Sequence, residues 1–126
     1  MYWTAIAALL LGLAVVFGAF GAHALRARLD DYSMGVYERA VFYHFVHALG
    51  LLIVSIMPRL SWLTESTAFW VCALLLAGII IFSGSLYALA VSGVRALGAI
   101  TPFGGLCFIA AWFLLALLLF RAVQLR

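Results

Sequence analysis

Four apolar stretches, each long enough to cross a lipid bilayer, constrain this chain more than any other feature. They run roughly over Trp3–Ala22, Tyr37–Met57, Thr67–Val91 and Pro102–Phe120. One helical crossing needs about 20 apolar residues. A soluble domain of 126 residues needs far more polar surface than a chain that is 69% hydrophobic and 9% charged can supply. We therefore expect a single transmembrane domain, residues 1–126, with four spans.

The spans are predicted to be helices and not the strands of a barrel. Barrel strands show about ten residues of alternating polarity, whereas the run "WVCALLLAGIIIF" from Trp70 to Phe82 is apolar on every side. A helix also satisfies its own backbone hydrogen bonds, which lipid cannot do. Because the connections are short, successive helices should be antiparallel neighbours. The expected fold is an all-α integral membrane four-helix bundle.

The longest connection follows the first span and allows two interpretations. Leu25, Leu29, Tyr32 and Val36 recur at helical spacing with charged residues between them. This pattern favours a short amphipathic helix at the membrane interface, and a solvated loop fits it equally well. Elsewhere the boundaries are clearer, because Pro58 should end the second span while Thr64–Glu65 and Thr101–Pro102 should begin the third and fourth.

Charge and cysteine content restrict the classes of partner. Seven arginines and no lysine stand against four acids, spread thinly over loops and ends. This distribution indicates contact with lipid headgroups and excludes a nucleic-acid surface. Four arginines on one side and three on the other, Arg126 among them, do not fix the membrane orientation. Cys72 and Cys107 should lie at different depths and stay unpaired.

The N-terminal stretch could be mistaken for a secretory leader. "AHA" at Ala22–Ala24 imitates a cleavage site, but no positive residues precede the apolar run, and that run is too long. We expect the stretch to remain as the first span.

Ionisable groups inside a span are costly and are therefore candidates for function. At about 100° per residue, one helical face carries Tyr37, Ala40, His44, His47 and Leu51. His44 and His47 are neighbours at i, i+3. This face should look into the bundle.

The two histidines allow several interpretations. They could be two ligands of a metal, although no motif supplies further ligands. They could relay protons toward Ser83 and Ser85, or bind an amphiphile near the interface with help from Arg39. We favour the remaining interpretation, in which they hydrogen-bond between helices. The candidate polar cluster, for binding or for structure, is His23, His44, His47 and Tyr87.

His23 sits in "GAFGAHAL", Gly18 to Leu25, at the end of the first span. An antiparallel hairpin could bring it near Glu38 or Tyr37. His23 could clasp the first two helices together, or it could face a cavity shared with His44 and His47. We favour the clasp.

Small residues spaced by four form a second pattern, typical of tightly packed membrane helices. They predict close helix contacts within the monomer or between protomers. The positions are Ala14, Gly18 and Ala22 on the first span, and Gly84 and Ala88 on the third.

Four segments together resemble one known family. They are "GAFGAHAL", His47–Ala48–Leu49, "FSGSLYAL" and "ITPFGGL", in this order along nearly the whole chain. The chain resembles the domain of unknown function 423 family of small four-helix membrane proteins, related to animal transmembrane protein 256. The resemblance implies a multi-pass protein, in bacteria of the inner membrane. Its signature implies His23, His47, Ser83, Ser85, Tyr87, Thr101 and Pro102 as motif positions.

No catalytic constellation and no phosphate-binding glycine loop is evident, so we expect neither an enzyme nor a cofactor or metal. The predicted role is packing, assembly or interaction in the membrane, as a small homo-oligomer or an accessory subunit in contact with lipids. The alternative is a small transporter or channel for protons, ions or an amphiphile, built on the histidine cluster.

Overall fold

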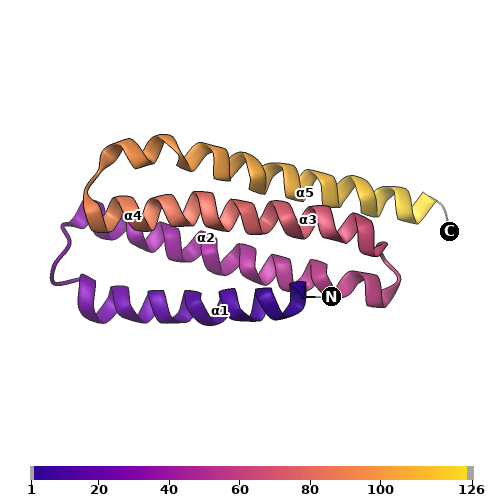
Figure 1. The fold of residues 1–126 in the computed structure, drawn as a ribbon, viewed down its shortest axis with the longest axis horizontal. Coiled ribbons are helices and arrows are strands. Elements are labelled where there is room, and N and C mark those ends of the chain that lie inside the picture. The colour runs from indigo at the N-terminus through magenta and orange to yellow at the C-terminus, as the bar shows by residue number, and fades with distance from the viewer. Residues whose placement is uncertain (1, 125–126) are drawn as a thin grey trace.

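The computed structural model describes residues 2–124, so Arg126 lies outside the described part. Four long helical segments follow one another, each antiparallel to the next, as predicted (Figure 1). The chain order is α1 (Trp3–Phe20), η1 (Gly21–Leu25), α2 (Asp31–Ile56), η2 (Met57–Leu60), α3 (Glu65–Gly78), η3 (Ile79–Ser83), α4 (Gly84–Ser92), η4 (Arg95–Ala99) and α5 (Thr101–Gln124).

The second span begins six residues earlier than predicted, at Asp31. The side chain of Asp30 accepts a hydrogen bond of 2.7 Å from the Ser33 amide and caps the helix there. Residues 26–30 form the turn, and Tyr32 already lies in the first turn of α2. Of the two interpretations of this connection, the interfacial amphipathic helix is therefore wrong, because its second half is the start of α2.

The other boundaries follow their sequence signals. Pro58 lies in η2, directly after α2. Thr64 and Thr67 form a reciprocal capping box that starts α3 at Glu65. Helix α4 ends at Ser92, and the φ of 71° at the next residue, Gly93, is the left-handed conformation that glycine adopts at little cost.

Two short π-helical turns interrupt the spans, and the sequence did not predict them. Segment η1 ends the first span, and η3 joins α3 to α4 within one continuous rod. A π turn adds a residue to the helix and rotates everything after it by about 100°. The side chains of α4 therefore face other neighbours than the periodicity of α3 would give them.

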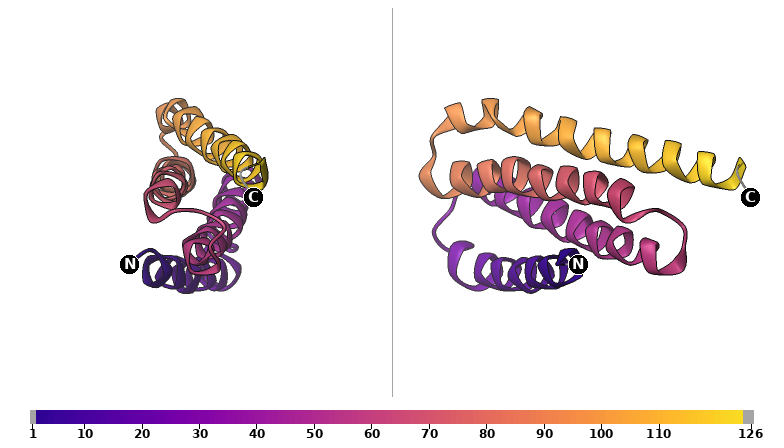
Figure 2. Two further views of the ribbon diagram at one scale, coloured as in Figure 1. Left: turned by 90° about the vertical axis from the view of Figure 1, so that its right-hand side faces the viewer. Right: turned by 45° about the vertical axis from the view of Figure 1, so that its right-hand side comes forward.

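The helices divide into a central pair and two outer helices. Figure 2 shows α1 and α5 on opposite sides of α2 and the α3–α4 rod. The most apolar windows of the two central spans are 50% and 44% buried, against 17% for the first span and 22% for the last. The core centres on Leu51, Val54, Val71 and Leu75. The outer helices thus leave most of their surface to the bilayer or to a partner.

Glycines allow the closest helix approaches. A Cβ on Gly50 would lie 2.7 Å from the Trp112 ring of α5, and one on Gly78 would collide with the Phe108 ring. A Cβ on Gly104 would collide with the backbone nitrogen of Phe82. Since backbone cannot move aside as a flexible side chain can, α5 needs glycine at position 104 to pack on η3.

Candidate functional site

The buried face of α2 holds His44 at the centre of the bundle. As predicted, Tyr37, Ala40, His44, His47 and Leu51 all face inward, each 7% exposed or less. His44 Nδ1 lies 3.0 Å from the Tyr87 hydroxyl on α4. Its Nε2 atom is buried and makes no hydrogen bond of standard geometry to any residue in 2–124, although the Leu10 backbone on α1 interacts with the ring. His44 therefore links α2 to α4 and leaves one polar atom unsatisfied.

Two aromatic residues, Phe17 of α1 and Tyr37 of α2, pack against the His44–Tyr87 pair. The Tyr87 ring meets the Phe17 ring at 5.0 Å and the Tyr37 ring at 5.3 Å, both edge-on. The Tyr37 hydroxyl donates a hydrogen bond of 2.6 Å to the backbone carbonyl of Phe17. Beside these rings, an almost purely apolar cavity of about 220 Å³ opens between α1 and α4. We call Phe17, Tyr37, His44 and Tyr87 the aromatic box.

His47 lies outside the aromatic box, although it is only one helical turn from His44. Its ring stacks on Phe108 of α5 with centroids 3.5 Å apart. Its Nδ1 atom donates a hydrogen bond of 2.8 Å to the Tyr43 carbonyl, one turn back on the same helix. From the same inward face of α2, His44 thus contacts α4 and His47 contacts α5. Among residues 2–124, no group of three or more His, Cys, Asp or Glu side chains could hold a metal.

His23 does not form the predicted clasp. It is exposed in η1 and makes no hydrogen bond or ion pair within the described chain. Glu38 pairs with Arg26 at 3.0 Å instead, and the Tyr37 hydroxyl bonds to Phe17. The π turn ends the span with His23 exposed. At this end of the bundle Tyr37 therefore joins α2 to α1, and Arg26 joins the turn to α2.

The serines of "FSGSLYAL" connect helices to one another. Ser83 donates a hydrogen bond of 2.9 Å to the Ala40 carbonyl of α2, and the Ser85 and Thr101 hydroxyls lie 2.7 Å apart between α4 and α5. Within residues 2–124, these hydrogen bonds form separate pairs and not a chain that reaches His44. Tyr37 was placed on the correct face by the sequence, but its contact with Phe17 crosses 20 residues and leaves no local signal.

Comparison with known proteins identifies the family. Residues 17–105 match the model described as "Protein of unknown function (DUF423)". The chain belongs to the DUF423 family. It is 46% identical over 111 residues to a UPF0382 membrane protein of Staphylococcus haemolyticus, covering 88% of each chain. It is 47% identical over 105 residues to the UPF0382 membrane protein YwdK of Bacillus subtilis, covering 82% of this chain and 83% of YwdK. No solved structure matches.

The DUF423 match includes every residue of the aromatic box and each serine contact described above. Together with the four apolar helices, the named relatives show a multi-pass membrane protein.

The small residues spaced by four form two stripes in this DUF423 chain: Ala14, Gly18 and Ala22 in the first span, and Gly84 and Ala88 on α4. The two stripes differ in their surroundings. Ala14 is 2% exposed, and a Cβ on Gly18 would meet Val41 of α2 at 3.5 Å, so this part of the first stripe packs within the monomer. Ala22 is exposed beyond it. On α4, Ala88 is exposed, and a Cβ on Gly84 would meet nothing within 4 Å. The second stripe has no covering helix in the described chain.

Proposed function

We propose that this DUF423 protein is an assembly module of the membrane, and that a second copy packs against the Gly84–Ala88 face of α4. The observation that carries the proposal is that α4 keeps a glycine and an alanine one turn apart on a face that no described helix covers. Small residues one turn apart let two membrane helices approach closely, and their association then gains van der Waals contacts.

Gly84 is a costly residue within the α3–α4 rod. Glycine is about 1 kcal/mol less favourable than alanine in a helix interior. Gly50, Gly78 and Gly104 are explained by rings or backbone that would collide with a Cβ. Gly84 lies next to open space, so internal packing does not explain it. A helix from another protomer, packed against this position, would explain the glycine.

A second uncovered face supports the same role. The outward side of α1 carries small exposed residues over its whole length, namely Ala5, Ala8, Gly12 and Ala19. A Cβ on Gly12 would meet nothing within 4 Å. Since the first span is the least buried of the four, α1 offers a further surface for a partner.

Cysteine cross-linking in native membranes tests the proposal. The starting chain carries Cys72→Ala and Cys107→Ala, which remove the two free thiols. Adding Ala88→Cys should give a disulfide-linked dimer on mild oxidation, because a two-fold interface brings the two copies of position 88 together. Adding Gly84→Leu to this chain should abolish the dimer, because the bulky side chain separates the helices.

The control is Ala116→Cys, an exposed small residue of α5 in the other half of the bundle. It should remain monomeric under the same oxidation. Equal cross-linking at positions 88 and 116 would indicate random collision, and no cross-linking at position 88 would refute this interface.

A further inference from the structure

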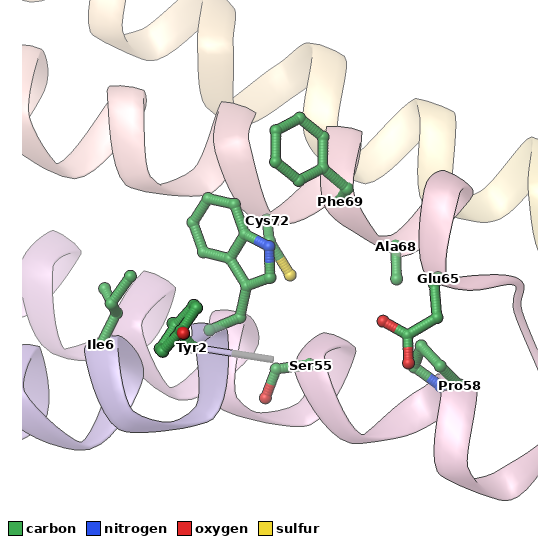
Figure 3. Close-up of a pocket in the computed structure, with 9 residues that line it drawn as sticks. Tyr2, Ile6, Ser55, Pro58, Glu65, Ala68, Phe69 and Cys72 are labelled. Atoms are coloured by element: carbon green, nitrogen blue, oxygen red, sulfur yellow. The ribbon is translucent and has the colours of Figure 1, made fainter.

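A cavity of about 350 Å³ opens at the other end of the bundle, between the start of α1, the end of α2 and the start of α3 (Figure 3). It exists because the first span is shorter than its neighbour. The helical segment Trp3–Leu25 has 23 residues, whereas Asp31–Leu60 has 30. The end of α2 and the start of α3 therefore extend beyond α1 and leave space above it.

Aromatic rings form much of the wall. Trp3 and Phe69 meet edge-on with centroids 5.5 Å apart, and Tyr2 lines the cavity beside them. Ile6 and Ala68 complete an apolar inner surface. The face of an aromatic ring carries partial negative charge and attracts cations, most strongly for tryptophan.

Glu65 places a full negative charge at the same cavity. It is the first residue of α3, and Figure 3 shows its carboxylate turned toward the space beside Pro58. Within residues 2–124, the Glu65 carboxylate makes no ion pair. Arg121 and Glu65 both line an adjacent cavity, but the guanidinium nitrogens of Arg121 lie more than 4.0 Å from the carboxylate oxygens. The position at a helix start favours an acid in its own right, yet it does not require aromatic walls around it. A carboxylate beside ring faces is complementary to an ammonium group.

We propose that this cavity binds the ammonium headgroup of an aminophospholipid, with phosphatidylethanolamine as the test ligand. Tryptophan and tyrosine occupy the headgroup level of a bilayer, and Tyr2, Trp3 and Trp62 mark this end of the spans. The volume admits a headgroup with a few methylenes, while the acyl chains remain in the bilayer. This inference does not depend on the proposed assembly interface, which lies on another helix.

Native mass spectrometry of the detergent-purified protein tests the site. The protein is given equal amounts of phosphatidylethanolamine and phosphatidylglycerol with identical acyl chains. The wild type should retain phosphatidylethanolamine about tenfold better, the expected effect of one charge-assisted hydrogen bond. Glu65→Gln should bring the ratio close to one. Trp3→Leu, which removes a wall without changing the charge, should lower the ratio severalfold and tests the site even if Glu65→Gln folds poorly.

Glu38→Gln is the matched control, because it removes an exposed acid at the opposite end of the bundle and should leave the ratio unchanged. Free ethanolamine at millimolar concentration should not displace the bound lipid, and displacement would overturn the assignment to a membrane lipid. Equal retention of the two lipids by the wild type would overturn the proposal. A folded Glu65→Gln protein that retains the two lipids in the wild-type ratio would also overturn the proposal.

Discussion

At the scale of single residues, His44 is the least ordinary side chain in the bundle. A buried imidazole loses its hydrogen bonds to water and must replace them. Tyr87 supplies one partner at 3.0 Å, and Nε2 is left without a bond of standard geometry. The helical period predicts that His44 shares a face with Tyr37 and His47, and the cost of ionisable groups in lipid predicts that this face looks inward. It could not show the partner, because 43 residues separate His44 from Tyr87.

Tyr87→Phe should destabilise the protein by about 1–3 kcal/mol, the cost of leaving a buried polar group unpaired. This exceeds the average of about 0.6 kcal/mol for hydrogen bonds between membrane helices, because both His44 ring nitrogens then lack a strong partner. Unfolding in mixed micelles measures the change. Tyr43→Phe is the control, since the Tyr43 hydroxyl makes no hydrogen bond in the described chain. Equal effects of the two substitutions would contradict the role of the pair.

His23→Gln should change the free energy of unfolding by less than about 0.5 kcal/mol, as is usual for exposed positions without partners. Tyr37→Phe should cost about 1 kcal/mol, because it removes the hydrogen bond to the Phe17 carbonyl. Unfolding in mixed micelles measures the free energies of unfolding of both variants. A loss of folded protein in His23→Gln alone would restore His23 as the clasp of the first two helices.

Asp30 should make the stability depend on acid pH. The hydrogen bond from the Ser33 backbone amide holds the pKa of the Asp30 carboxyl below its ordinary value of 3.8. A lowered folded pKa gives stability that is fully present above 3.8 and is lost as the pH falls through the folded pKa. Thermal unfolding of Asp30→Asn, which keeps a capping oxygen without the charge, should lose this part of the acid dependence. Identical pH profiles for the two chains would contradict the cap.

At the scale of elements, the helices were predictable and their irregular turns were not. Apolar run length and capping residues set most boundaries, and Thr64 caps α3 as expected. The π turns η1 and η3 arise from how whole helices fit together. Glycine content likewise did not separate Gly104, where an added Cβ would meet backbone, from Gly84, where it would meet nothing within 4 Å. Both look alike in a sequence because the neighbour comes from another part of the chain.

Gly104→Ala should destabilise the bundle by about 1–3 kcal/mol through overpacking, because its Cβ would collide with the Phe82 backbone. Gly105→Ala is the neighbouring control. Its Cβ would meet the Phe82 ring at an ordinary 3.8 Å, and alanine also favours the helix. We expect Gly105→Ala to be neutral or slightly stabilising in the same unfolding titration. Equal losses for both would mean that α5 does not pack on η3 as described.

At the scale of the whole molecule, composition and four apolar runs were sufficient to predict a four-span membrane protein. They did not show that α2 and the α3–α4 rod form a central pair with α1 and α5 outside. Since most of the surface of every span is apolar, hydropathy alone cannot tell a helix face that meets protein from one that meets lipid. Only the structure distinguishes the two stripes of small residues, because it shows that one packs against α2 and the other faces outward.

The measurement that tests assembly most directly is native mass spectrometry of the protein released from lipid nanodiscs. The wild type should appear mainly as a dimer, because the Gly84–Ala88 face accepts a second copy. Gly84→Leu should appear as a monomer, while Ala116→Leu on the exposed side of α5 should stay dimeric. A wild type that is monomeric under conditions that preserve bound lipid would contradict the proposed assembly.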